Sequence, residues 1–295
     1  MCRAIASVQC QSWTEYELII VDDHSEPPLA ETADRVLAGA GRIIRATGYG
    51  AAAARNDGIR AASGDYIAFL DSDDVFLPCK LERAAEHLEE TPGAVIYSRV
   101  WMDFGDGVGE VRPARAMTAG EALPDYLFAS GALIATPSLV VPRRLAVAVG
   151  WNETLGYGDD SDFVIRLWLQ GATFRFVPEV LVHCDAHHRG PRLSTCGSVQ
   201  ELERWLTAMT PHMGRRAVLN YRATHLVALR GLPGLGRSIA DIILAGLVGG
   251  LKPSAAARSL ARGIIPGKIF RHLRRWACRL RHAGGRQKPK LIQTP

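Results

Sequence analysis

The chain has 295 residues, of which 47% are hydrophobic and 22% are charged. This composition is ordinary for a globular protein and excludes a disordered or fibrous chain, while the length allows one substantial domain with an appendage. The six cysteines form no CxxC pair, which excludes a zinc ribbon and fits a reducing, cytosolic setting. No apolar run is long enough to cross a bilayer, and we expect no secretory signal.

The net charge of +5 hides an uneven distribution along the chain. No acidic residue follows Asp241, whereas twelve Lys and Arg lie between Lys252 and Lys290. The chain before Lys252 carries 23 basic against 30 acidic residues, so it is acidic and the tail is strongly basic.

The first third of the chain alternates between strand and helix patterns. Short apolar runs predict strands at 16–21, 42–45, 65–70 and 94–100. Helical spacing, an alanine-rich segment and a proline near the start predict helices at 29–37, 50–62 and 78–90. This alternation predicts a doubly wound, Rossmann-like α/β fold with a mostly parallel sheet flanked by helices. Ligand-binding groups are expected at the carboxyl ends of its strands.

The pattern is weaker in the second third. We expect a helix at 119–128, a strand at 138–141, a helix at 160–169, and strands at 174–177 and 180–183. A loop rich in His and Arg follows at 185–194.

The sharpest chemical signal is Asp71-Ser72-Asp73, directly after an apolar strand. Two carboxylates one residue apart can turn toward one ion, and hard oxygen ligands suit Mg²⁺ or Mn²⁺. A divalent metal placed there can neutralise a diphosphate leaving group. An isolated motif of this kind also fits a solvated acidic turn, or a helix start capped by Asp74.

Longer strings around this motif resemble the family 2 glycosyltransferases of the GT-A fold. They are Ala54-Arg-Asn-Asp-Gly-Ile59 and Ala62-Ser-Gly-Asp-Tyr-Ile-Ala-Phe-Leu-Asp-Ser-Asp-Asp74, with Tyr16-Glu-Leu-Ile-Ile-Val-Asp-Asp-His-Ser25 upstream and Gly150-Trp-Asn-Glu153 and Asp159-Asp-Ser-Asp162 downstream. The matches run in consistent order over roughly residues 4–195.

Two departures from the family pattern stand out. His24 replaces the usual glycine of the Asp-Asp-Gly-Ser turn. The family's first strand and its Pro-Tyr-Asn-like turn have no counterpart, which we interpret as a late start or a damaged copy. Because that strand normally lies inside the sheet, its absence would leave neighbouring strands without hydrogen-bond partners.

The resemblance implies roles on the donor side of the site. Asp23, with Asp22 beside it, would accept hydrogen bonds from the nucleobase or ribose, or would only shape an Asx-turn. Arg55 would contact the nucleotide. Asp71 would face the ribose or the metal, and Asp73 would ligate the metal directly.

The resemblance also implies a general base. Asp160 would take a proton from an acceptor hydroxyl as that oxygen attacks the anomeric carbon from the face opposite the diphosphate, which inverts the configuration. Asp159 stands where the family usually has Glu, so Asp159 or Asp162 is an alternative base. All three carboxylates also favour the positive end of a helix.

The loop at 185–194 adds basic groups. His187 aligns with a histidine that in many family members lies near the diphosphate or metal, although a loop histidine is more often solvated. Arg189 and Arg192 could bind phosphate oxygens through paired donors, or could be surface charges.

An amphipathic basic helix is predicted at 267–282. Its apolar face would carry Ile269, Phe270, Leu273, Trp276, Ala277 and Leu280. Such a helix suits the headgroup region of an anionic membrane. Packing onto its own catalytic domain and binding of nucleic acid are the alternatives.

The sequence therefore predicts a GT-A catalytic domain at 1–210, a helical basic extension at 211–283 and a disordered tail at 284–295. The reaction would move a sugar from a UDP- or dTDP-linked donor to a hydroxyl of a glycan or lipid-linked acceptor, with Mn²⁺ or Mg²⁺ as cofactor. We expect a cytoplasmic enzyme of cell-envelope polysaccharide biosynthesis, peripheral on the inner face of the cytoplasmic membrane, with no nucleic-acid partner.

Two alternatives to this enzyme remain. A truncated remnant would bind a nucleotide sugar or a partner protein without catalysis. A nucleotidyltransferase should carry a Gly-rich, Lys-containing triphosphate loop near its start, and the sequence has none.

Overall fold

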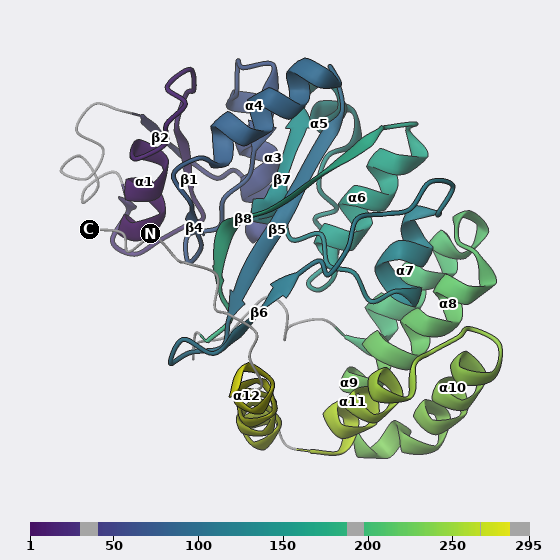
Figure 1. Cartoon of the computed structure of the whole chain (residues 1–295). Coiled ribbons are helices and arrows are strands. Elements are labelled where there is room, and N and C mark those ends of the chain that lie inside the picture. Colours follow the sequence, from purple (N-terminus) through teal and green to yellow (C-terminus); the bar gives the residue numbers. More distant parts are fainter. Residues whose placement is uncertain (30–40, 188–197, 266, 284–295) are drawn as a thin grey trace.

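The computed structural model describes residues 1–29, 41–187, 198–265 and 267–283 (Figure 1). Over these residues the chain forms an α/β fold in which helices flank two β-sheets, and further helices follow at the C-terminal end (Figure 1). Three predictions fall outside the described residues. They concern residues 30–37 of the helix predicted at 29–37, the phosphate-binding arginines Arg189 and Arg192, and the disordered tail at 284–295.

The larger sheet has the strand order β3-β7-β5-β8-β4, with β6 added to β5. These strands are β3 (Tyr66–Ala68), β4 (Val75–Phe76), β5 (Val95–Asp103), β6 (Gly109–Arg112), β7 (Leu139–Pro142) and β8 (Phe174–Asp185). Strands β5 and β8 run parallel, whereas β7 pairs antiparallel with both β3 and β5.

The sheet is therefore mixed, whereas a mostly parallel sheet was predicted. Only a π-helical turn (Asp125–Ala129) and a short 3-10 turn (Thr136–Ser138) lie between β6 and β7. A parallel return needs a full crossover helix. The predicted α/β class with flanking helices is confirmed.

The smaller sheet consists of β1 (Ile19–Asp22) and β2 (Arg42–Arg45), which pair in parallel. Within the described residues, β1 pairs only with β2, and β3 pairs only with β7. Helix α1 (Cys2–Gln9) lies beside β4, where the Phe76 N–H donates to Ser7 Oγ at 3.1 Å.

Local differences from the sequence prediction follow from tertiary contacts. The strands expected at 174–177 and 180–183 are one strand, β8, which runs through Pro178 and pairs with β5 at a register shift near Ser98. The helix expected at 119–128 is the π-helical turn Asp125–Ala129. Strands β4 and β6 were not predicted, because neither has a long apolar run.

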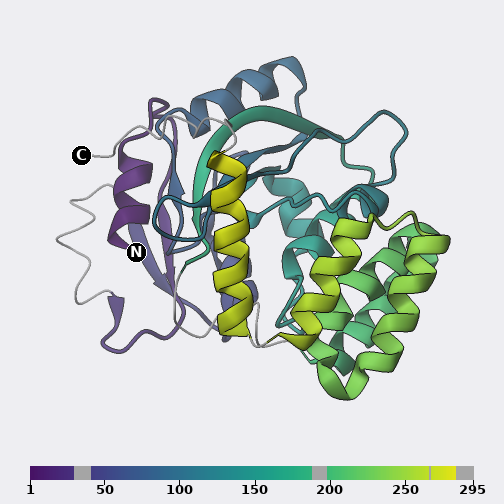
Figure 2. The same ribbon diagram turned by 60° about the horizontal axis from the view of Figure 1, so that its bottom comes forward.

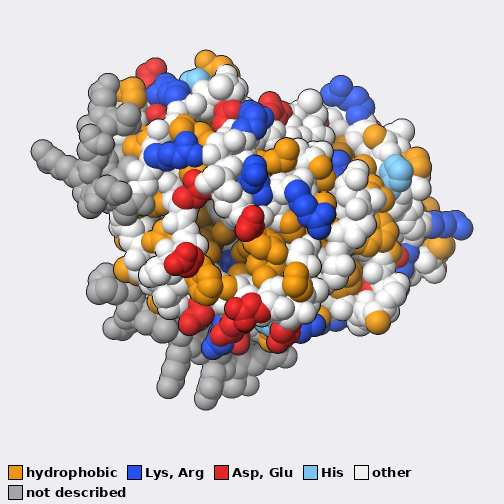
Figure 3. Space-filling model, turned by 90° about the horizontal axis from the view of Figure 1, so that it is seen from above, with side chains coloured by type: hydrophobic (Ala, Val, Ile, Leu, Met, Phe, Trp, Pro, Cys, Tyr) orange, Lys and Arg blue, Asp and Glu red, His pale blue; other side chains and the backbone are white. Residues whose placement is uncertain are grey.

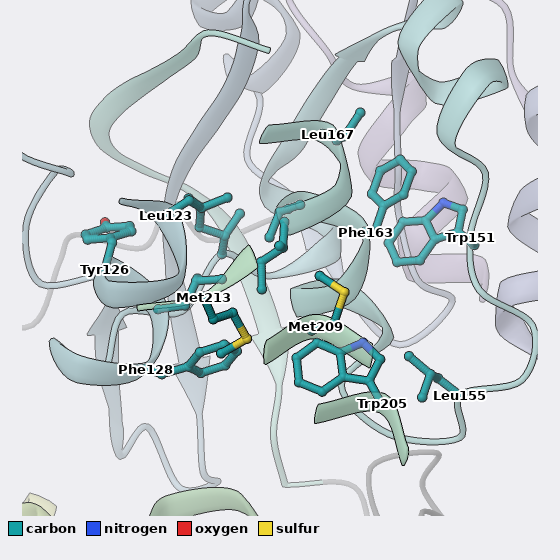
Figure 4. Close-up of a cluster of buried hydrophobic side chains, with 14 of the residues drawn as sticks. Leu123, Tyr126, Phe128, Trp151, Leu155, Phe163, Leu167, Trp205, Met209 and Met213 are labelled. Atoms are coloured by element: carbon teal, nitrogen blue, oxygen red, sulfur yellow. The ribbon is translucent and has the colours of Figure 1, made fainter. Parts of the chain in front are cut away.

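The main hydrophobic core lies between the sheet and its covering helices (Figure 4). These helices are α3 (Ala51–Ala61), α5 (Arg143–Val149), α6 (Asp159–Leu169) and α7 (Val199–Met209). Trp151 stacks on Phe163 with ring centroids 4.2 Å apart, and Trp205 of α7 belongs to the same cluster. Aromatic side chains bury the largest apolar areas, so this cluster fixes α6 and α7 against the sheet.

Helix α4 (Lys80–Glu90) begins with a buried lysine. Lys80 has no exposed surface, and its Nζ donates to the Ser138 carbonyl at 2.9 Å. Burial lowers the pKa of Lys80 to about 7.

Five α-helices end the described part of the chain, gathered toward the lower end of the molecule in Figure 1. They are α8 (Arg215–Tyr221), α9 (Val227–Arg230), α10 (Leu235–Leu247), α11 (Pro253–Ile264) and α12 (Gly267–Ala283). Ala217, Val218 and Tyr221 of α8 belong to the main core, whereas Ala245 of α10 belongs to a smaller cluster. None of the helices in the described ranges is long and apolar enough to span a bilayer.

Candidate active site

The turn after β1 is shaped by Asp22. Its carboxylate is buried and accepts hydrogen bonds from the N–H groups of Ser25 at 3.0 Å and Leu29 at 3.1 Å, and from Arg45 Nη1 at 3.0 Å. The pKa of Asp22 is lowered, because these hydrogen bonds and Arg45 outweigh the burial that raises it. Both oxygens are therefore used inside the loop.

Asp23 is exposed and lies beside the start of α3. Its two oxygens accept the Gly50 N–H at 3.0 and 3.1 Å. Next to it, the His24 ring stacks on Tyr49 with centroids 4.2 Å apart, and the Tyr49 side chain is 81% exposed. His24 has φ 57, a left-handed conformation that explains why the family usually has glycine there. The aromatic surface of Tyr49 was missed from the sequence.

Arg55 joins the two halves of the site. Its guanidinium donates to Asp71 Oδ1 and to Asp159 Oδ2, each at 2.7 Å, and lies 4.5 Å from the centre of the Trp151 ring. Burial lowers the pKa of Arg55, but the charges of Asp71 and Asp159 outweigh it and leave the pKa raised. Helix α3 thus holds the end of β3 and the start of α6 at one point.

Asn56, the next residue on α3, fixes the loop before α6. Its side chain donates to the Trp151 carbonyl at 3.0 Å and to Glu153 Oε1 at 2.7 Å, and it accepts the Trp151 N–H at 2.7 Å. Asn56 thus fixes the local backbone and places the acidic start of α6 opposite Arg55.

The acidic turn after β3 carries three carboxylates. Asp73 is exposed, and Asp71 is partly exposed beside Arg55. Asp74 is buried and accepts the Asp185 N–H at 3.0 Å. Burial raises the pKa of Asp74 to about 7, and the charges of Asp71 and Asp73 add to the effect. Asp74 does not cap a helix, because β4 follows it directly.

Helix α6 begins with a second acidic group. Burial raises the pKa of Asp160 to about 6, and the neighbouring charge of Asp159 adds to it. Asp162 is 2% exposed and accepts Arg166 Nε at 2.7 Å and Trp205 Nε1 at 2.8 Å. Both Asp162 oxygens are therefore bonded inside the protein, whereas Asp160 is partly exposed and its Oδ1 accepts the Ser161 N–H at 2.6 Å.

Side chains from a distant part of the chain lie near Asp160. Burial raises the pKa of Tyr221, and the charges of Tyr157 and Asp160 add to the effect. His225 stacks on Tyr221 with centroids 4.6 Å apart, and burial lowers its pKa to about 4. No local motif connects these residues to the acidic segment, so they could not be predicted from the sequence.

The three predicted metal ligands do not form a preassembled site. No group of three or more His, Cys, Asp or Glu among the described residues is arranged to hold a metal ion, so Asp71, Asp73 and His187 do not converge. The His187 N–H donates to Asp185 Oδ1 at 2.8 Å, and its ring packs against Gly105, where a Cβ would lie 2.6 Å from Nδ1.

Comparison with known sequences identifies relatives of this chain. Residues 1–139 match the family model for glycosyl transferase family 2. The chain is 31% identical over 235 residues to the amylovoran biosynthesis glycosyltransferase AmsB of Erwinia amylovora, covering 75% of this chain and 78% of that protein. It is 36% identical over 177 residues to the succinoglycan biosynthesis protein ExoW of Rhizobium meliloti, covering 52% of this chain and 54% of that protein.

The fold has relatives among solved structures. Residues 1–349 of S. aureus TarS, in complex with UDP-GlcNAc, superpose with a TM-score of 0.61 at 12% identity, covering 98% of this chain and 90% of that one. Fold and site together define a glycosyltransferase of the GT-A fold. The chain belongs to glycosyl transferase family 2.

Proposed function

We propose that this glycosyltransferase is an inverting, metal-assisted enzyme that moves a sugar from a nucleotide-diphosphate donor to a hydroxyl of a glycan or lipid-linked acceptor. The observation that carries the proposal is Arg55, because one guanidinium holds Asp71 of the donor-side turn and Asp159 of the base-side helix. The leaving group and the attacking hydroxyl must meet at one place, and this pairing brings their two segments together.

The nucleotide would lie at the turn after β1. Asp23 is exposed there and offers carboxylate oxygens to a base or ribose, while Tyr49 offers a flat aromatic surface beside it. Asp22 takes a turn-shaping role, because its oxygens are bonded in the loop. TarS has been solved with UDP-GlcNAc and with UDP, which supports a UDP-linked donor.

A divalent metal would be held by Asp71 and Asp73. The fit is chemical: three carboxylates share one turn, and their mutual repulsion contributes to the raised pKa of Asp74. Mg²⁺ is commonly held by one or two carboxylates together with substrate phosphates, so two protein ligands suffice. When bound, the ion would neutralise charge on the diphosphate. The approach of His187 to the diphosphate stays a prediction.

Asp160 would be the base. It accepts the proton of the acceptor hydroxyl while the oxygen forms its bond to the anomeric carbon and the bond from that carbon to the diphosphate breaks. A pKa of about 6 leaves the carboxylate ionised at neutral pH yet basic enough to accept a proton. Arg55 engages Asp159, so Asp160 is the freer of the two neighbours.

The test is release of nucleoside diphosphate from a panel of nucleotide sugars by the full chain with Mn²⁺. We expect release with at least one donor, loss of release on chelation, and a fall of about 100-fold in Asp73→Asn. Asp65→Asn is the matched control, because Asp65 is an exposed carboxylate at the opposite end of β3. Unchanged release in Asp73→Asn would show that the metal role is wrong, and no release with any donor would favour the non-catalytic remnant.

A further inference from the structure

The basic face of α12 is turned toward the protein. Arg274 pairs with Glu110 at 2.7 Å, Arg279 pairs with Asp106 at 3.1 Å, and Arg275 also pairs with Asp106. Glu110 lies on β6 and Asp106 in the turn between β5 and β6. The helix therefore docks through its arginines on an acidic hairpin. The sequence had suggested a helix in the headgroup region of an anionic membrane, with packing onto the catalytic domain as the alternative that these contacts match.

The opposite side of α12 is apolar and exposed. Cys278, on the docked side, is buried in a cluster with Phe104 and Val108. Ile269, Leu273, Trp276 and Leu280 are 53%, 47%, 62% and 54% exposed. Their spacing of four, three and four residues places them on one helical face, which we call the outer face of α12.

Exposed apolar side chains concentrate in these C-terminal helices. Of the 16 large hydrophobic side chains exposed in the described residues, 11 lie between Leu232 and Leu280. Besides the outer face of α12, they are Leu232, Ile239, Ile243, Leu244, Leu247, Val248 and Ile264. Helices α10, α11 and α12 lie at the same end of the molecule (Figures 1 and 2). Viewed from the other end, basic and acidic side chains are interspersed (Figure 3).

The positive charge of the C-terminal helices indicates which kind of partner would bind there. No acidic residue follows Asp241, and nine Lys and Arg lie between Lys252 and Arg281 in the described part of the chain. A second copy of the chain would bring the same positive charge to the contact and be repelled. An anionic lipid surface is attracted, and it also accepts Ile, Leu and Trp side chains below its headgroups.

We propose that the outer face of α12, together with the exposed aliphatic side chains of α10, is a docking surface for an anionic lipid bilayer. The arginines of α12 would hold the helix on the acidic hairpin and present its apolar side outward.

The docked side of α12, opposite the docking surface, connects to the acidic turn of the candidate active site. Ala186 packs against the Cys278 cluster, and the adjacent Asp185 donates its N–H to Asp74 of the acidic turn. A lipid-linked acceptor in the bilayer would therefore reach the site past α12, a consequence that rests on the proposed function.

Vesicle binding of the full chain tests the proposal without any sugar nucleotide. Wild type is sedimented with vesicles of phosphatidylcholine containing phosphatidylglycerol, and with phosphatidylcholine alone. We expect wild type to bind the anionic vesicles. The double variant Leu273→Ser with Trp276→Ser should partition onto them at least about tenfold more weakly. The paired control, Val147→Ser with Leu169→Ser, removes two side chains that are 53% and 40% exposed elsewhere and should bind as wild type does.

The result separates this proposal from the proposed function. Nucleoside diphosphate release without vesicles should be the same in wild type and the α12 variant, because neither residue lies in the candidate active site. The docking surface is refuted if wild type does not sediment with anionic vesicles, or if the α12 variant sediments as well as wild type. A wild-type dimer in analytical ultracentrifugation that is lost in the variant would instead assign the face to a second copy.

Discussion

Two acidic segments, the turn at 71–74 and the start of α6 at 159–162, divide their carboxylates in the same way. Each has one member paired with Arg55, namely Asp71 and Asp159. Each also has one member buried and hydrogen-bonded inside the protein, Asp74 and Asp162. One member of each segment remains available, namely Asp73 or Asp160.

The difference between the two segments lies in the buried member. Asp162 has an ion pair with Arg166 at 2.6 Å, whereas Asp74 is bonded to the backbone N–H of Asp185 and carries a pKa raised to about 7, first by burial. The turn at 71–74 is thus short of positive charge in the described part of the chain, and the start of α6 is not. This contrast supports a cation at the turn and a proton acceptor at the helix.

The largest expected effect is that of Asp160→Asn. Removing the proton acceptor should lower the rate of glycosyl transfer by about 10²–10⁴-fold, because an amide cannot accept the hydroxyl proton. The measurement is kcat with a donor and acceptor pair at pH 7.5, with circular dichroism to confirm folding. A rate within a few-fold of wild type would reassign the base to Asp159.

Arg55→Met tests the connection between the two segments. We expect kcat to fall about 10–100-fold, because the two carboxylates lose their common partner and shift. The Arg55 charge lowers the pKa of Asp160, which is about 6 in wild type, so its removal should raise that pKa. Activity is lost below this pKa because the base is then protonated. The acid limb of the pH–rate profile should therefore move to higher pH in Arg55→Met.

Arg55→Lys is the control for the charge alone. A lysine keeps the positive charge, so the acid limb should move less, but one ammonium cannot span two carboxylates as the guanidinium fork does. If Arg55→Met kept the wild-type rate and pH–rate profile, Arg55 would not connect the two acidic segments.

The smallest effect on activity is expected for Asp162→Asn. It should destabilise the protein by about 2 kcal/mol, because Arg166 loses its partner and the Trp205 contact weakens, with kcat near wild type. Urea unfolding followed by tryptophan fluorescence measures the change. Asp160→Asn is the matched substitution two residues away and should not be destabilising, since it removes repulsion with Asp159.

The sequence predicted those parts of the fold whose signal is local. The strand predicted at 42–45 has the same bounds as β2, Arg42–Arg45. The helix predicted at 50–62 agrees with α3 to within one residue at each end. The Asp-x-Asp turn and the acidic start of α6 were found for the same reason. The contact between Arg55 and Asp159 spans 104 residues of chain, and no spacing rule encodes it.

Helix α12 shows a second limit of sequence reasoning. Its periodicity correctly placed Leu273 and Trp276 on one face and most basic residues on the other. Periodicity says which residues share a face, but the direction of that face depends on the neighbour. Here the acidic residues Asp106 and Glu110, distant in sequence, bind the arginines and turn the helix apolar side out.

Lys80, the buried first residue of α4, makes the free energy of unfolding of this protein depend on pH. Its pKa falls from the usual 10.5 to about 7 on folding, so between these pH values the unfolded chain binds a proton that the folded chain does not. Stability contributed by this residue is complete above the unfolded pKa and is lost as the pH falls toward 7. The urea midpoint should therefore rise between pH 7.5 and 9.5, and rise less in Lys80→Met, whose side chain does not titrate.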